Sequence, residues 1–236
     1  MASLVTSHPG FVKDVSFDFY GRRLATCSAD ERSRIEVHDQ DEEGKWTVRH
    51  GPWAAHDSTI NKARRTLFCI PLPSGLHDRA CKGDIPLPPY ASFQVCWAHP
   101  KFGQILASCS DDTSIEIWEE QDTLSGSQPK WHKRITLSEP LKPVKDIAFC
   151  PSHLGLKIAA ACMDGHCYVY GCNDVMNLAE WLLEEKFEAF EGVHARNLGV
   201  RCLAWNPSKF DPPSLVVGEG CRGPPSVHRE GSLCQA

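Results

Sequence analysis

Two pairs of histidine and aspartate residues are the side chains of this sequence best suited to chemistry. His8 and His56 each precede an apolar run by four residues. Asp30 and Asp112 each follow a run of small residues further along the chain. A histidine beside a carboxylate is the combination used in general acid–base catalysis, but the same pair can also tie a loop to a turn.

The recurrence of these residue types favours the structural interpretation. Asp164 follows a third small-residue run, so the aspartate recurs once per copy of a longer pattern. Catalytic groups converge on one site, whereas residues that repeat with the fold belong to its architecture. We therefore predict no catalytic residues and a hydrogen-bonded network within each repeat. The predicted turn and network residues are His8, Ser28, Asp30, His56, Ser110, Asp112, Trp118 and Asp164.

Cysteines and a histidine near the middle of the chain raise the question of a metal site. Cys162, Cys167 and Cys172 are spaced five apart, with His166 among them. Zinc sites more typically pair cysteines two residues apart, so we predict no metal. The chain also lacks a glycine-rich loop that opens a helix and a serine nucleophile elbow, so we predict no cofactor. An enzyme that uses cysteine and histidine chemistry is the least favoured alternative.

The elements that would position these residues form a repeat. Each copy has an apolar, strand-like run, a run of small residues, usually an aspartate, and a second apolar run. A unit of this size that cannot bury both of its faces must stack on its neighbours. The pattern predicts an all-β fold, a partial β-propeller of about three and a half blades. The predicted blades lie near residues 8–50, 53–137 (with an insert at 63–94), 144–190 and 200–218.

The spacing of aromatic residues at the start of each copy locates the insert. Phe17, Trp97, Phe149 and Trp205 are 80, 52 and 56 residues apart, so the first interval is too long. Residues 63–94 contain five prolines and no sustained period of two or 3.6. We interpret this block as a long loop or as sequence from an unspliced transcript. Residues 219–236 lack strand alternation and are predicted to be a disordered or aberrant tail.

The composition excludes several classes of protein. With 25 basic and 30 acidic residues the net charge is −5, which argues against direct nucleic-acid binding. No apolar stretch is long enough to span a membrane, and the first residues do not resemble a secretory signal. Many of the 12 cysteines sit in apolar runs, which favours reduced thiols in an intracellular compartment.

Longer phrases resemble one family. Residues 14–30, 97–110, 153–156 and 174–181 are similar to successive blades of the Seh-type WD-repeat nucleoporins, paralogues of the Sec-type coat propeller. The resemblance covers roughly residues 8–62 and 95–217. The sequence departs from that family in holding fewer repeats and in carrying the 63–94 insert.

The resemblance implies a structural scaffold of the nuclear pore complex at the nuclear envelope. Such proteins form an open six-bladed propeller that an α-solenoid nucleoporin of the Y-shaped coat subcomplex completes with an extra blade. The implied roles are protein and mRNA transport, beside other coat nucleoporins, and a second role in a nutrient-signalling coat complex at the lysosomal or vacuolar membrane. The alternative is a vesicle-coat propeller involved in trafficking.

The resemblance also suggests where a partner would bind. The N-terminal region of the family flanks the open side of the propeller, and unpaired strand edges invite strand addition. The expected partner interface is Phe11, Val12, Lys13, Asp14 and Val15. Because blades are missing, we also expect apolar blade faces to be exposed.

Overall fold

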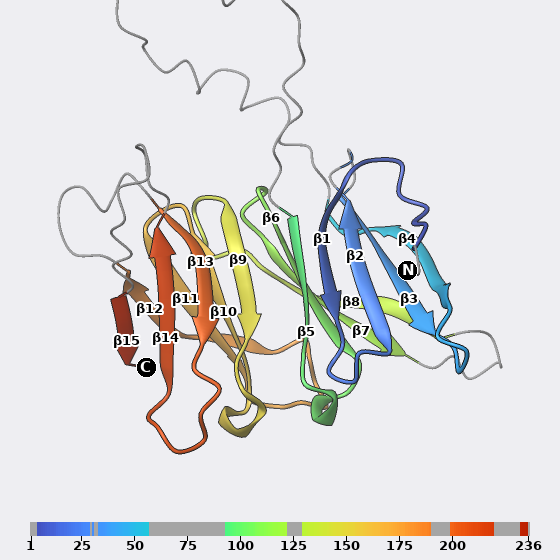
Figure 1. Ribbon diagram of the computed structural model, residues 1–236. Helices are drawn as coiled ribbons and strands as arrows, with labels where there is room; N and C mark the ends of the chain where they lie inside the picture. Colours follow the sequence, from blue (N-terminus) through green and yellow to red (C-terminus); the bar gives the residue numbers. More distant parts are fainter. Residues whose placement is uncertain are drawn as a thin grey trace, which may run out of the picture.

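The computed structural model shows four antiparallel sheets arranged side by side (Figure 1). It describes residues 4–28, 30, 33–56, 93–121, 129–189, 199–219 and 232–235. Within these residues the only helical elements are two single-turn 3-10 helices, Pro100–Phe102 and Ser152–Leu154. None of the described helical segments has the length or apolar character that crossing a membrane requires.

Each of the first three sheets has four strands in simple up-and-down order, and the fourth has three. Blade 1 contains β1 (Val12–Phe17), β2 (Arg23–Ser28), β3 (Arg34–Gln40) and β4 (Trp46–Ala54). Blade 2 contains β5 (Phe93–Trp97), β6 (Ile105–Ser110), β7 (Ile115–Gln121) and β8 (Lys130–Leu137). Blade 3 contains β9 (Val144–Phe149), β10 (Leu156–Cys162), β11 (His166–Cys172) and β12 (Trp181–Glu188). Blade 4 contains β13 (Val200–Trp205), β14 (Ser214–Glu219) and β15 (Ser232–Gln235).

The first strands of the four blades lie beside one another along the inner side of the arc. Strand β1 contacts β5, β5 contacts β9, and β9 contacts β13, whereas the last strand of each blade lies at the periphery. The blades therefore radiate from a common inner edge, as in a propeller. This arrangement confirms the predicted all-β, partial propeller.

Small residues on the second strands allow the blades to approach closely. On β2, Ala25 and Cys27 are fully buried, and on β10 the run Ala159–Ala161 is fully buried on both faces. A strand buried on both faces loses the usual alternation of apolar and polar residues. Larger side chains at these positions would separate the blades, which explains the small-residue run in every copy.

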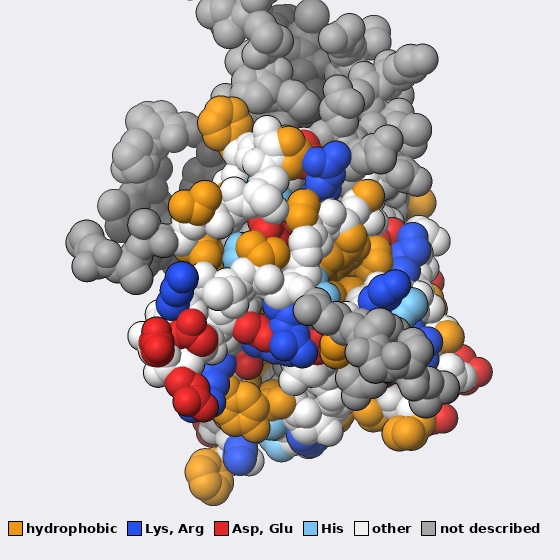
Figure 2. Space-filling view, turned by 90° about the vertical axis from the view of Figure 1, so that its right-hand side faces the viewer, with side chains coloured by type: hydrophobic (Ala, Val, Ile, Leu, Met, Phe, Trp, Pro, Cys, Tyr) orange, Lys and Arg blue, Asp and Glu red, His pale blue; other side chains and the backbone are white. Residues whose placement is uncertain are grey.

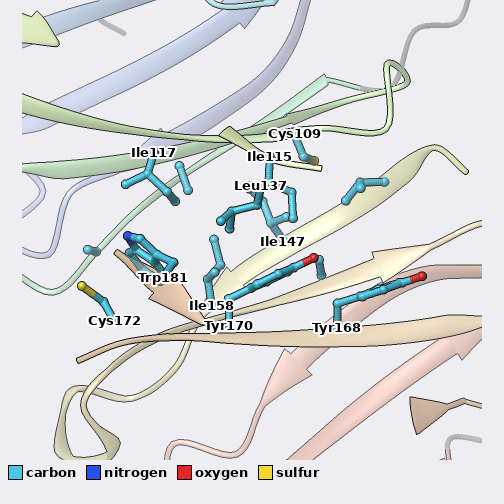
Figure 3. Close-up of a cluster of buried hydrophobic side chains, with 14 of the residues drawn as sticks. Cys109, Ile115, Ile117, Leu137, Ile147, Ile158, Tyr168, Tyr170, Cys172 and Trp181 are labelled. Atoms are coloured by element: carbon cyan, nitrogen blue, oxygen red, sulfur yellow. The ribbon is translucent and has the colours of Figure 1, made fainter. Parts of the chain in front are cut away.

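Apolar clusters fill the spaces between neighbouring blades. Figure 3 shows the largest, between blades 2 and 3, where Ile115 and Ile117 of β7 face Ile158 of β10 and the stacked Tyr168 and Tyr170 of β11. Two further clusters lie between blades 1 and 2 and between blades 3 and 4. The core of the molecule is thus a series of contacts between blade faces.

Recurring hydrogen bonds join the inner strands of neighbouring blades. The Asp14 carboxylate of β1 accepts from the Val95 backbone N–H of β5 at 3.1 Å, and the Trp97 indole donates to the Ser16 carbonyl at 2.9 Å. Blades 3 and 4 repeat both contacts. There Asp146 accepts from the Leu203 N–H at 2.8 Å, and the Trp205 indole donates to the Ala148 carbonyl at 3.1 Å. These bonds satisfy backbone and indole groups that would otherwise be orphaned.

A charged cluster fastens blade 1 to blade 2 nearer the periphery. The Arg23 guanidinium contacts Glu120 at 2.5 Å and Asp39 at 3.2 Å, and His50 lies 2.8 Å from the second Glu120 oxygen. Burial acts to raise the pKa of the Glu120 carboxyl, but Arg23 and His50 outweigh it and hold that pKa below its usual range. The Glu120 carboxylate of β7 is therefore charged at neutral pH and bonded to two residues of blade 1.

The predicted tail and the predicted insert are described only in part. Residues 232–235 of the predicted tail form β15, which pairs with β14, so the tail is not entirely without structure. Without β15, one edge of β14 would leave its backbone groups unpaired, and the pairing satisfies them. The rest of the tail, from residue 220, and residues 63–92 of the predicted insert lie outside the described residues. The division of the chain into segments stays a prediction.

Candidate functional site

The histidine–aspartate network of blade 2 is complete and buried. His56 Nδ1 lies 2.8 Å from the Asp112 carboxylate and 3.1 Å from the Ser114 hydroxyl, and His56 Nε2 lies 3.0 Å from the Ser108 hydroxyl. The Trp118 indole N–H donates to the same Ser108 hydroxyl at 3.1 Å. The chain of bonds therefore links the segment after β4 to the β6–β7 turn and to the middle of β7.

Asp112 also fixes the tight turn between β6 and β7. Its second oxygen accepts from the Ser114 N–H at 2.9 Å and from the Ser114 hydroxyl at 2.7 Å. Thr113 between them has φ of 75°, a left-handed conformation that a β-branched residue adopts only when its surroundings impose it. Burial acts to raise the pKa of Asp112, but the bonds from His56 and Ser114 outweigh it and lower the pKa. The charged carboxylate holds the turn.

Ser110 was expected in this network, and the structure places Ser108 there instead. Both residues lie on β6, two positions apart and on the same face. The histidine reaches the middle of the strand, because its other ring nitrogen is already at the turn with Asp112. Sequence spacing alone does not show which residue of a strand a distant histidine will bond.

Blade 1 has a partial version of the same network. His8 Nε2 lies 2.8 Å from the Thr26 hydroxyl, the counterpart of Ser108, and not beside Ser28. The Ser28 hydroxyl instead donates to Asp30 at 2.9 Å. The structure therefore holds these predicted residues in two separate contacts rather than in one network.

Two polar residues of β3, Glu36 and His38, are fully buried in blade 1. The Ser7 backbone N–H and hydroxyl donate to the two Glu36 oxygens at 3.0 and 2.6 Å, which fixes the N-terminal segment on the sheet. His38 takes the place that Trp118 has in blade 2. Both its ring nitrogens are buried, and neither has a hydrogen-bond partner among the described residues.

Replacing His38 by phenylalanine should stabilise the protein and reduce its sensitivity to acid. Burial lowers the pKa of His38, so the folded chain keeps the ring neutral, whereas the unfolded chain protonates it below pH of about 6.5. Stability from the neutral ring is therefore present above that pH and is lost as the pH falls. His38→Phe removes this loss and adds about 1 kcal/mol at neutral pH, because no polar group is left unbonded.

Urea unfolding at several pH values between 7 and 5 measures this effect. The exposed His132, changed to phenylalanine, provides the control. An equal loss of stability on acidification in wild type and His38→Phe would contradict the prediction.

Blade 3 fixes its turn with residues of the turn itself and of β11, and no histidine from the segment before the blade takes part among the described residues. The Asp164 carboxylate accepts from the Tyr168 hydroxyl at 2.6 Å and from the His166 backbone N–H at 2.9 Å. Gly165 in this turn has φ of 89°, a conformation that glycine adopts without strain. A tyrosine and a glycine thus replace the serine, the histidine and the strained threonine of blade 2.

Burial and hydrogen bonding restrict the described groups that could act as a base or a nucleophile. The side chain of His56 is completely buried and bonded on both nitrogens. Burial also raises the pKa of the Cys150, Cys162 and Cys172 thiols, which keeps them protonated and poorly nucleophilic. No cluster of three or more metal-binding side chains occurs in the described part of the chain.

The five residues expected at a partner interface separate into two groups. Phe11, Val12 and Val15 have exposed side chains on or before β1, and Lys13 is also exposed. Asp14 is half-buried and bonds β5, and burial raises its pKa. Asp14 therefore joins two blades of this chain rather than facing outward.

A larger apolar surface lies next to these residues, and sequence analysis did not single it out. We call the face of blade 1 that is turned away from blade 2 the leading face. Figure 2 looks onto this side of the molecule and shows hydrophobic side chains at its surface. The leading face of blade 1 carries Val15, Phe17, Leu24, Thr26, His38 and Val48.

Residues of this surface are more exposed than the residues at the same positions in blade 2. Val15 is 55% exposed, whereas Val95, its counterpart on the leading face of blade 2, is 3% exposed because it packs on blade 1. Phe17 is 58% exposed, and its counterpart Trp97 is partly buried against blade 1. The N-terminal segment covers part of this face, where His8 bonds Thr26 and Ser7 bonds Glu36. Val15 and Phe17 stay exposed, so this part of the leading face is a blade-packing surface without a blade packed on it among the described residues.

Comparisons with known proteins agree with this architecture. The WD domain, G-beta repeat family matches residues 2–35 and 90–119. Among solved structures, Sqt1 of Saccharomyces cerevisiae aligns with a TM-score of 0.57 at 10% identity, over 90% of this chain and 44% of that one. Sqt1 of Chaetomium thermophilum gives 0.56 at 16% identity, over 89% and 42%. At these identities the likeness shows the fold alone.

The sequence relatives are more specific. Nucleoporin SEH1 of Bos taurus and nucleoporin SEH1 of Homo sapiens are each 34% identical to this chain over 229 residues. The alignment covers 94% of this chain and 52% of either relative, so the chain spans about half the length of the curated relatives it matches. The sheets and repeats define a WD-repeat β-propeller protein. Within that class, the chain is similar in sequence to the nucleoporins named SEH1.

Proposed function

We propose that this chain is a structural scaffold component of the nuclear pore complex, within its Y-shaped coat subcomplex. Homology to nucleoporin SEH1 supports this assignment and a location at the nuclear envelope. The scaffold would support transport of protein and mRNA through the pore. Membership of a nutrient-signalling coat complex at the lysosomal or vacuolar surface is a second role that the same kind of binding would permit.

The exposed part of the leading face of blade 1, which carries Val15, Phe17 and Val48, is the observation that carries this proposal. In blades 2 to 4 the corresponding faces are packed on a preceding blade. We propose that an α-solenoid nucleoporin supplies the missing neighbour by donating strands that pack against Val15, Phe17 and Val48. Such a contact buries the apolar side chains of this face, and the donated strands act as an extra blade of the propeller.

The proposed role is binding rather than catalysis. The His56 side chain of blade 2 is buried, and its partner Asp112 fixes the β6–β7 turn. The sequence relatives of the chain from Bos taurus and Homo sapiens are named as nucleoporins. The energy of partner binding should be concentrated on Phe17, the exposed aromatic side chain of this face, because aromatic anchors dominate interfaces.

Binding of the purified chain to an α-solenoid nucleoporin of the Y-shaped coat tests the proposal. We expect a complex whose affinity falls at least about tenfold on Phe17→Asp. Met176→Asp is the matched control, because Met176 is an exposed apolar residue in the turn before β12. Failure to form a complex, or a complex that Phe17→Asp leaves intact, would count against this function.

A further inference from the structure

Two buried glutamates at the same position in successive blades differ in their hydrogen bonds. Glu36 of β3 lies opposite Thr26 of β2. Glu116 of β7 lies opposite Ser108 of β6, the counterpart of Thr26. The Glu36 and Glu116 side chains are 0% and 7% exposed. In blade 1 the backbone N–H and the hydroxyl of Ser7 donate to the two Glu36 oxygens, so each oxygen has a donor.

Glu116 has a donor on only one of its oxygens among the described residues. Ala55 stands in blade 2 where blade 1 has Ser7, directly before the histidine of the network. Alanine has no hydroxyl, and the Ala55 N–H donates to the Ser33 carbonyl instead, at 3.0 Å. The Lys133 ammonium lies 3.1 Å from Oε1 of Glu116, but the buried Oε2 has no partner in the described part of the chain. A buried carboxylate oxygen without a donor is costly, so this position calls for one.

The Glu116 side chain lines a polar pocket between blades 1 and 2. The pocket has a volume of about 300 Å³, at the lower end of the range for ligand sites, so it can hold a single side chain. Ala54, Lys133 and Thr136 of its lining are exposed, which gives the pocket access from solvent. Thr136 is the direct neighbour of Glu116 on β8, and its hydroxyl is a second polar group of the pocket.

The charges of this pocket favour a cation. Asp112 and Glu116 are the acids of its lining, and Lys133 is the lysine. The ring nitrogens of His56, which also lines the pocket, are already within hydrogen-bond distance of Asp112 and Ser108. Burial raises the pKa of Glu116, and attraction to His56 and Lys133 opposes this rise only in part. A further positive group at Oε2 would stabilise the charged carboxylate.

We propose that this pocket binds the guanidinium group of an arginine side chain from a bound polypeptide. Its five N–H donors lie in one plane, so it can donate to Oε2 of Glu116 and to the Thr136 hydroxyl together. A guanidinium is less strongly hydrated than an ammonium and therefore loses less on entering a half-enclosed pocket. A polypeptide is the natural source, because in blade 1 a segment of chain, through Ser7, supplies the donors at this position.

The site goes beyond the proposed scaffold role and is separate from it in space. The pocket lies between blades 1 and 2, whereas Phe17 is on the leading face of blade 1. Phe17→Asp should therefore leave arginine binding unchanged while it weakens binding of the α-solenoid nucleoporin. Glu116→Gln should have the opposite pattern, so the two proposals can fail separately.

Titration of the whole chain with the blocked peptide acetyl-Gly-Arg-Gly-amide, followed by NMR of the backbone amides, tests the proposal. We expect saturable shifts of the Glu116 and Thr136 signals with a dissociation constant on the order of 1 mM. Glu116→Gln keeps the shape of the side chain and should weaken binding at least about fivefold. Glu185→Gln is the matched control, because it removes one negative charge from the exposed part of β12 and should change nothing.

Two further measurements separate a guanidinium site from general attraction of cations. The peptide acetyl-Gly-Lys-Gly-amide should bind at least about threefold more weakly than the arginine peptide. Lys133→Met should strengthen binding of the arginine peptide, because it removes a positive charge beside Glu116.

Several results would overturn the proposal. Shifts that do not saturate would mean that water alone satisfies Oε2 of Glu116. Equal binding of the lysine and arginine peptides, or binding that Glu116→Gln leaves intact, would exclude a guanidinium site at this carboxylate. Binding of free L-arginine without binding of the peptide would exclude a polypeptide as the source.

Discussion

Replacing His56 by alanine should lower the free energy of unfolding by about 3 kcal/mol. His56 bonds Asp112, Ser114 and Ser108, and its side chain is completely buried. Without His56, the Asp112 carboxylate loses one hydrogen-bond partner, and so does the Ser108 hydroxyl, which also accepts from Trp118. The loss exceeds the value of any one hydrogen bond, because buried polar groups that are left without a partner keep the full cost of their removal from water.

The loss of local stability in His56→Ala should be largest in blades 1 and 2. Because Asp112 holds the strained Thr113 turn, loss of its partner should loosen the β6–β7 hairpin. Amide hydrogen exchange should therefore accelerate in β6 and β7 more than in β10 and β11. Urea unfolding followed by tryptophan fluorescence gives the global value.

His8→Ala is the matched comparison. The ring of His8 has the same position in blade 1, but its hydrogen bond is to Thr26 alone, so its removal should cost about 1 kcal/mol. Equal losses in the two variants would show that the wider network in blade 2 contributes nothing, contrary to our interpretation.

The repeat made the fold predictable from the sequence. Alternating runs such as Val15 to Phe17 marked the inner strands, and the run of small residues marked the strands that are buried on both faces. Each aspartate after such a run predicted a tight turn, and the structure places Asp112 and Asp164 in tight turns. These signals are local, because a strand and the turn that follows it are encoded within about ten residues.

Contacts between blades were harder to predict because they join distant residues. Asp14 and Val95 are separated by 81 positions, and Arg23 and Glu120 by 97. Asp14 therefore seemed available to a partner, whereas the adjacent blade uses it. Nothing in the local sequence distinguishes a carboxylate that bonds the next blade from one that faces solvent.

The exposed leading face illustrates a different limit. Val15 and Val95 have the same place in their repeats, yet only Val15 is exposed. Burial here depends on whether a preceding blade is present, which the residue itself does not encode. The repeat alone carries no signal for this difference, because in blades 2 to 4 the same face is packed on the blade before it.

Replacing Ile117 by alanine should have the other large effect, a loss of about 2–5 kcal/mol in the free energy of unfolding. Ile117 is fully buried in the cluster between blades 2 and 3, where it faces β10 and β11 (Figure 3). Truncation removes apolar contacts and leaves a cavity, because the paired sheets on both sides cannot collapse to fill it. Urea or thermal unfolding measures the loss.

Leu182→Ala provides the control, because Leu182 lies on the peripheral strand β12 with its side chain exposed. It should change the free energy of unfolding by no more than about 0.5 kcal/mol. In a propeller the stability comes from faces packed between blades, so the difference between these two variants measures that contribution directly. If Ile117→Ala were no more costly than Leu182→Ala, the blades would not be stabilising one another, and blade completion by any partner would lose its physical basis.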